Sequence, residues 1–139
     1  MLITSTSVAT IRPTDRRARL WPSAVVSGLV AAAATTTVAA IAHEFGSPPA
    51  ISGKEIPLYA FAQLTLIGAL LGAVIAKVLS ARLQHPRRAF VRTAMVLAAM
   101  SIIPDLVVDT TIGARLTLVF THAVASAIIV PALARRLAR

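Results

Sequence analysis

Cysteine and asparagine are absent from the 139 residues, and only five side chains are acidic. The lack of cysteine excludes disulfide exchange, thiolate catalysis and cysteine-ligated metals. It therefore also excludes the quinone-linked membrane enzymes of similar size that form disulfides. Charged residues make up only 14% of the chain, against 57% hydrophobic residues and a mean hydropathy of +0.80. This composition leaves too little polar surface for a soluble globule of this size.

Four long apolar stretches occupy most of the chain. They run approximately over residues 20–42, 57–81, 89–109 and 114–134. As a helix, each stretch is long enough to cross a hydrocarbon core about 30 Å thick, at about 1.5 Å per residue. The sequence therefore predicts an all-α polytopic membrane protein, an antiparallel bundle of four transmembrane helices. This bundle forms one domain, residues 20–139, behind a disordered basic tail, residues 1–19.

Basic residues fall almost wholly on one side of the implied membrane. Of the 14 Lys and Arg residues, twelve lie in the N-terminal tail, around the link between the second and third stretches, or at the C-terminal end. Only Lys54 and Arg115 lie in the other two loops. Because these loops are short, the positive-inside rule predicts that both termini are cytoplasmic (N-in/C-in). Composition, with no asparagine and much alanine and arginine, is typical of a GC-rich bacterial genome, which indicates a multi-pass protein of a bacterial cytoplasmic membrane.

The net charge of +9 does not indicate a nucleic-acid partner, because the basic residues are spread over three cytoplasmic edges and form no single groove. At those edges we expect contacts with the anionic head groups of membrane lipids. A cleaved signal peptide is the alternative for the first 42 residues, since Ala40-Ile41-Ala42 resembles a cleavage site. The apolar stretch there is longer than the apolar core of a signal peptide, which is usually about 7–15 residues, and this favours a membrane span.

Polar side chains at membrane depth gather in the outer half of the predicted bundle. Asp105 and Asp109 are four residues apart and would share one face of a helix. His122 would lie roughly 13 Å below the outer end of the last helix. Burial of such groups in a membrane is expensive, so a functional site is the default hypothesis. We expect catalytic roles for Asp105, Asp109 and His122. The expected ligand-binding residues are Glu44, Tyr59, Gln63, Arg115 and Thr121.

Several chemistries fit this set of side chains. An Asp-x-x-x-Asp pair holds Mg²⁺ on a diphosphate in membrane prenyltransferases, but those enzymes need a second acidic motif, which this chain lacks. We therefore predict no metal and no cofactor. Two carboxyls that share a buried site can leave one of them protonated at neutral pH. Such an acid could drive cyclisation or isomerisation of an isoprenoid, with His122 or Glu44 as the base.

Structural explanations stand beside the functional ones. His122 could hydrogen-bond Asp105 or a carbonyl only to hold two helices together, and Asp105 could pair with Arg115 across the turn. The motif from Gly68 to Gly72 predicts either a homo-oligomer seam or packing within the chain. A small dimeric exporter is a further class. The four-helix multidrug exporters, however, rely on a carboxylate in the middle of their first helix, and this chain has none there.

A resemblance to one family covers roughly residues 20–139. It rests on the basic Pro86-Arg87-Arg88 turn, on Ser101, Pro104 and Arg115, and on a last helix with His122 and an Ile129-Val130-Pro131-Ala132-Leu133-Ala134-Arg135 ending. In these features the chain resembles DUF6069, a family of small actinobacterial four-helix membrane proteins of unknown function. The resemblance implies the same topology and singles out His122, Pro131 and Arg115, but it implies no reaction.

The leading hypothesis is an integral membrane protein with a polar pocket in the outer half of the bundle. That pocket would bind a lipid-like or isoprenoid molecule, and general-acid catalysis by the aspartate pair is the enzymatic version. The non-enzymatic alternative is a structural or accessory membrane subunit, in which the polar cluster only joins helices.

Overall fold

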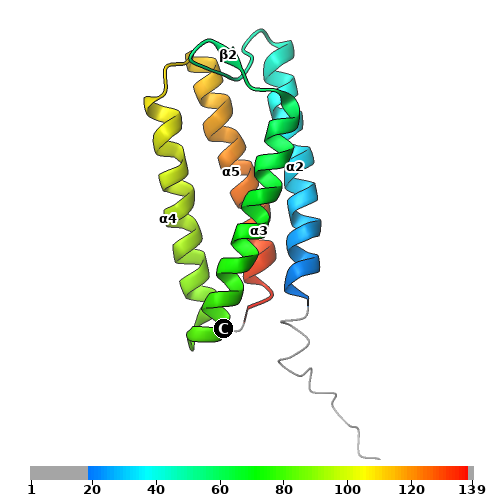
Figure 1. Cartoon of the computed structure of the whole chain (residues 1–139), viewed down its shortest axis with the longest axis vertical. Coiled ribbons are helices and arrows are strands. Elements are labelled where there is room, and N and C mark those ends of the chain that lie inside the picture. Colours follow the sequence, from blue (N-terminus) through cyan, green and yellow to red (C-terminus); the bar gives the residue numbers. More distant parts are fainter. Residues whose placement is uncertain (1–18, 138–139) are drawn as a thin grey trace, which may run out of the picture.

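The computed structural model describes residues 19–137 and consists mainly of four long helices packed side by side (Figure 1). They are α2 (Leu20–Glu44), α3 (Leu58–Arg82), α4 (Pro86–Val107) and α5 (Ile112–Ala134). Each helix is long and apolar enough to cross a membrane. The chain is therefore an all-α, multi-pass membrane protein folded as a four-helix bundle, as the sequence predicts. The predicted tail, apart from Arg19, lies outside the described residues.

The two ends of the bundle differ in charge. Successive helices run antiparallel, so the start of α2, the α3–α4 turn and the end of α5 share one end (Figure 1). This basic end carries Arg19, Lys77, Arg82, Arg87, Arg88, Arg92, Arg135 and Arg136. The opposite end, which we call the hairpin end, carries Lys54 and Arg115 with the acidic residues Glu44, Glu55 and Asp109. The segregation on which the predicted orientation rests is thus present in the folded chain, while the orientation itself stays a prediction.

The third helix is shorter at its C-terminal end than the sequence predicts. Pro86 stands at its start, where a missing N–H does no harm, and the helix ends at Val107. Val108 is extended, with φ −67° and ψ 144°. Four of the five residues from Val107 to Thr111 are β-branched, which is unfavourable for a helix and favourable for extended backbone. Asp109 therefore lies in the α4–α5 linker, and the expectation that Asp105 and Asp109 share a helix face is wrong.

A small β-hairpin between α2 and α3 covers the hairpin end of the bundle. Strand β1 (Ala50–Ile51) pairs antiparallel with β2 (Lys54–Glu55). Ser52 and Gly53 between them both have positive φ, as a two-residue type I′ turn requires. The Ser52 N–H donates to the Asp109 carbonyl (2.9 Å), and the Thr110 hydroxyl donates to the Ala50 carbonyl. The hairpin is thus tied to the α4–α5 linker.

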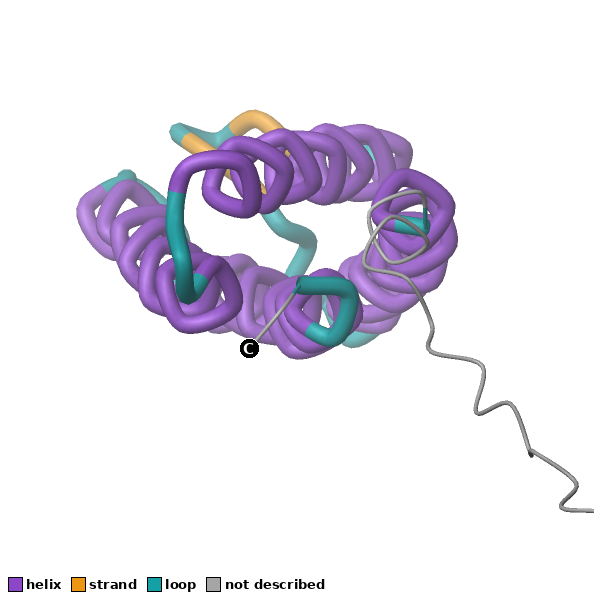
Figure 2. Tube along the Cα trace, turned by 90° about the horizontal axis from the view of Figure 1, so that it is seen from below, coloured by secondary structure: helices purple, strands orange, loops and turns teal. Residues whose placement is uncertain are grey.

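Packing around the bundle is uneven. Viewed along its axis, the four helices form a flattened ring (Figure 2). α2 packs extensively on α3 and α5. Gly28 lets α2 and α3 approach closely, because a Cβ there would lie 2.9 Å from the Ala69 Cβ. α4 packs mainly on α5 and buries only Pro86, Phe90 and Asp105. α3 and α4 consequently touch less than α2 and α3 do.

The two glycines of the motif in α3 have different surroundings. A Cβ on Gly72 would lie 3.2 Å from Leu133 Cδ1, so Gly72 brings α3 close to α5 within the chain. A Cβ on Gly68 would meet no atom within 4 Å. Gly72 therefore has a packing role inside the bundle. A homo-oligomer formed through Gly68 and Gly72 stays a prediction.

Gly28 provides a test of the α2–α3 contact. We expect Gly28→Val to lower the free energy of unfolding by about 1–2 kcal/mol, because the added methyl groups overlap Ala69 and force the helices apart. Gly68→Ala is the matched control and should be neutral or slightly stabilising, since its Cβ enters open space. Denaturant titration in mixed micelles measures both. Equal stability of the two variants would contradict the close approach.

Candidate functional site

A groove of about 630 Å³ lies between α3 and α4, with α5 and part of α2 as its floor. This volume is in the range of about 300–1,000 Å³ typical of small-molecule sites. The residues at its edges, including Leu64, Ile67 and Leu71 of α3 and Leu97 of α4, are exposed. They form the lips of an opening on the apolar outer surface of the bundle. We call this feature the α3–α4 groove.

Small side chains on three helices create the α3–α4 groove. Gly68 of α3, Ala94 and Ala98 of α4, and Ala125 of α5 all line it. Where facing helices carry such residues but are held apart by their neighbours, the missing side-chain volume remains open. Along α4 the lining runs from Phe90 to Asp105, which corresponds to roughly 22 Å of helix. The groove therefore extends over most of a membrane span.

Asp105 and His122 meet at the end of the groove nearest the hairpin. His122 Nδ1 lies 3.0 Å from Asp105 Oδ2 and 3.1 Å from the Leu118 carbonyl oxygen. A hydrogen on Nδ1 can be donated to either oxygen, and the contact with the Leu118 carbonyl has hydrogen-bond geometry. Asp105 Oδ2 is buried and accepts no hydrogen bond from the described residues, although it lies at ion-pair distance from the imidazole. The pair is therefore only partly satisfied within the chain.

Asp105 reaches His122 because α4 and α5 are offset along their axes. Asp105 lies two residues before the end of α4, whereas His122 lies ten residues after the start of α5, or roughly 15 Å along it. The linker between the helices rises from the top of α4 to the start of α5 (Figure 1). Asp105 consequently lies well below the hairpin and beside the middle of α5.

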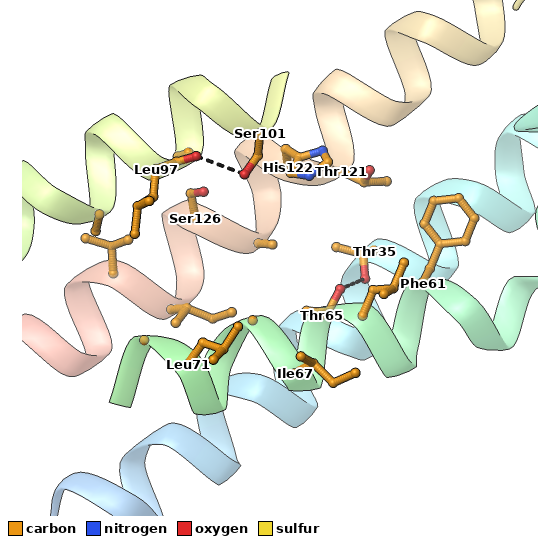
Figure 3. A pocket seen from close by; sticks show the side chains of 18 of the residues that line it. Thr35, Phe61, Thr65, Ile67, Leu71, Leu97, Ser101, Thr121, His122 and Ser126 are labelled. Carbon is orange, nitrogen blue, oxygen red and sulfur yellow. Dashed lines mark hydrogen bonds between the residues drawn. The ribbon is translucent and has the colours of Figure 1, made fainter. Parts of the chain in front are cut away.

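Hydroxyl groups supply the other polar atoms of the groove, and Figure 3 shows their arrangement. Ser101 on α4 lies near His122 and Ser126 on α5, while Thr35 and Thr65 form a hydrogen-bonded pair (3.0 Å) between α2 and α3 (Figure 3). The hydroxyls of Ser101 and Thr121 donate to the carbonyls of Leu97 and Leu118, each at 2.8 Å. Their oxygens keep lone pairs that can accept a hydrogen bond.

The structure brings together only some of the residues that the sequence singles out. Asp105, His122 and Thr121 line the α3–α4 groove, with Asp105 and Thr121 buried. Four other residues of the predicted set are exposed and do not line the groove: Glu44, Tyr59, Gln63 and Asp109. Tyr59 is 70% exposed on the outside of α3. For these four side chains a role in the groove now has no geometric support.

Arg115 is half-buried and forms a hydrogen bond with the backbone. Its Nη2 donates to the carbonyl of Val108, 3.2 Å away, just beyond the end of α4. A guanidinium in that position interacts favourably with the C-terminal end of the α4 dipole. It forms no ion pair with either aspartate among the described residues, so the predicted pairing of Asp105 with Arg115 is wrong; the partner of Asp105 is His122. Arg115 holds the linker in place.

Sequence reasoning misses most of the groove wall. The hairpin residues Ile51 and Ile56 line its upper end, and Thr35 and Thr65 lie on its floor. The two threonines could have been found from the sequence, since both are polar residues at membrane depth on neighbouring helices. The two isoleucines could not, because only the fold of the loop brings them over the bundle.

These observations define an integral membrane protein of four spans. Its groove is open to the side, mostly apolar along its length, and has two ionisable side chains at one end. Residues 15–139 match the family of unknown function DUF6069, so the chain belongs to that family. The match confirms the resemblance, which rests on the basic turn, on Ser101, Pro104 and Arg115, and on the motif in the last helix, α5. No curated protein and no solved structure matches the chain.

Proposed function

We propose that this membrane protein binds a lipid-like or isoprenoid molecule that enters the α3–α4 groove sideways from the bilayer. One observation carries the proposal. A buried carboxyl group with an incompletely satisfied oxygen, Asp105, stands with His122 at one end of a groove whose remaining surface is mostly apolar. An amphiphile matches both parts, because its chain fills the apolar length and its polar end reaches the pair.

Binding is favoured over the acid-catalysed cyclisation that the aspartate pair first suggested. That chemistry needs two carboxyls in one site, and Asp109 is exposed in the linker while Asp105 lines the groove. The only ionisable side chains among the described lining residues are Asp105 and His122. The proposal is therefore a ligand-binding protein of the membrane, and the bilayer is the source of its ligand.

Two alanines on α4 give a matched test. Ala98 lines the groove, whereas its neighbour Ala99 is exposed and does not. Ala98→Phe fills the groove and should weaken binding of geranylgeraniol at least tenfold, a loss of about 1.4 kcal/mol. Ala99→Phe adds the same side chain toward lipid and should leave binding unchanged. Native mass spectrometry of the purified protein in detergent micelles measures the bound fraction against probe concentration.

Binding that is equally strong in both variants would show that geranylgeraniol only coats the apolar surface, and it would overturn the proposal. The proposal is also overturned if the native chain binds none of geranylgeraniol, geranylgeranylamine and geranylgeranyl diphosphate. The unfolding midpoint of each variant, measured in the same detergent, confirms that any loss of binding reflects the filled groove and not an unfolded bundle.

A further inference from the structure

We infer that the head group of this ligand is a hydrogen-bond donor without negative charge, and that a protonated amine is preferred over an alcohol. This inference rests on the proposed function and specifies the chemical class of ligand for the same groove. Its basis is the set of polar atoms that the chain leaves unsatisfied at the head-group end.

The unsatisfied atoms at that end are mainly acceptors. Asp105 Oδ2 is buried, its residue is 9% exposed, and its one polar contact among the described residues is His122 Nδ1 at 3.0 Å, without hydrogen-bond geometry. The hydroxyl hydrogens of Ser101 and Thr121 are already given to backbone carbonyls, so their oxygens can only accept. In the neutral tautomer that carries its hydrogen on Nδ1 and donates it to Leu118, the other ring nitrogen of His122, Nε2, is an acceptor.

Groups that would hold an anion are missing from the described lining of the groove. No Lys or Arg belongs to it, and Arg115, in the linker region, donates a hydrogen bond to the carbonyl of Val108. The other basic residues described lie at the opposite end of the bundle, apart from Lys54 of the exposed hairpin. A phosphate or carboxylate placed beside Asp105 would meet a like charge in a medium of low dielectric constant, where repulsion is strong.

A cationic donor has the opposite effect. An ammonium group beside Asp105 Oδ2 would complete the hydrogen bonding of that oxygen and compensate its charge, as a charge-assisted hydrogen bond does. It could also donate to Ser101 or Thr121, whose oxygens have free lone pairs. An alcohol supplies one neutral donor and satisfies the carboxylate less well. The expected order of affinity is therefore amine, then alcohol, then diphosphate.

Three probes with one chain and different heads test the inference: geranylgeranylamine, geranylgeraniol and geranylgeranyl diphosphate. We expect the amine to bind roughly tenfold or more tightly than the alcohol, since hydrogen bonds between charged groups exceed neutral ones. The diphosphate should show no saturable binding that Ala98→Phe abolishes. Asp105→Asn, nearly the same shape, should remove the advantage of the amine over the alcohol.

The outcomes separate this inference from the proposed function. If the probes bind and Ala98→Phe weakens them, the groove is the site; a diphosphate that then binds as tightly as the amine overturns the head-group inference alone. Persistence of the amine preference in Asp105→Asn overturns it as well. If Ala98→Phe leaves the binding of every probe unchanged, the proposed function itself is wrong. The probe series on the native chain decides the matter even if Asp105→Asn does not fold.

Discussion

In intact bacterial cells, a membrane-impermeant maleimide will label Ser52→Cys and will leave Gln84→Cys unlabelled until the membrane is permeabilised. Ser52 lies in the exposed hairpin turn and Gln84 in the exposed α3–α4 turn, at opposite ends of the bundle. The chain contains no native cysteine, so each introduced thiol is the only one present. The expected difference is all or none, because a charged maleimide does not cross the bilayer.

This expectation follows from the charges at the two ends. The α3–α4 turn and the adjoining helix ends carry Arg82, Arg87, Arg88 and Arg92, whereas the hairpin end has two basic and three acidic residues. Short loops rich in Lys and Arg stay in the cytoplasm. Labelling of both thiols after permeabilisation is the control for reactivity. If Gln84→Cys reacts in intact cells and Ser52→Cys does not, the N-in/C-in orientation is wrong.

Removing one member of the Asp105–His122 pair will destabilise the bundle more than removing both. His122→Leu leaves the buried carboxyl of Asp105 without its partner, and we expect the free energy of unfolding to fall by about 2 kcal/mol. A fully buried pair loses about 3–5 kcal/mol when it is broken. The effect is smaller here because the His122 side chain is 39% exposed.

The double variant Asp105→Leu/His122→Leu should recover most of that loss, because it removes the unpaired carboxyl together with its partner. With Asp105→Leu it completes a double-mutant cycle, measured by denaturant titration in mixed micelles. Hydrogen bonds between membrane helices average only about 0.6 kcal/mol. A coupling near or below that value would mean that the two side chains do not act as a pair.

The same cycle separates a binding site from simple helix contact when it is combined with the probe measurements. If the pair only joins α4 to α5, its variants change stability and leave head-group preference unchanged. If the pair is the polar end of a site, Asp105→Asn changes head-group preference in a protein that still folds. The partly satisfied Oδ2 favours the second outcome, because a purely structural contact would satisfy its buried atoms.

Particular residues show where sequence reasoning reached the site and where it stopped. Asp105 and His122 stood out because ionisable groups are rare at membrane depth, and both line the α3–α4 groove. Asp109 stood out by its spacing alone, which presupposed a helix that in fact ends at Val107. Tyr59 and Gln63 were included because of their depth, but the rotation of α3 turns them outward. Depth is readable from a sequence, whereas helix rotation is not.

The four spans, the charge difference between the two ends and the family can all be read from the order of the residues. These are properties of each segment on its own, since transfer into a bilayer depends on the local run of side chains. The pairing of Asp105 with His122, the bond from Arg115 to the linker and the groove between α3 and α4 appear only once the helices are packed together. Those features depend on the axial offset, rotation and close approach of different helices, which no single segment encodes.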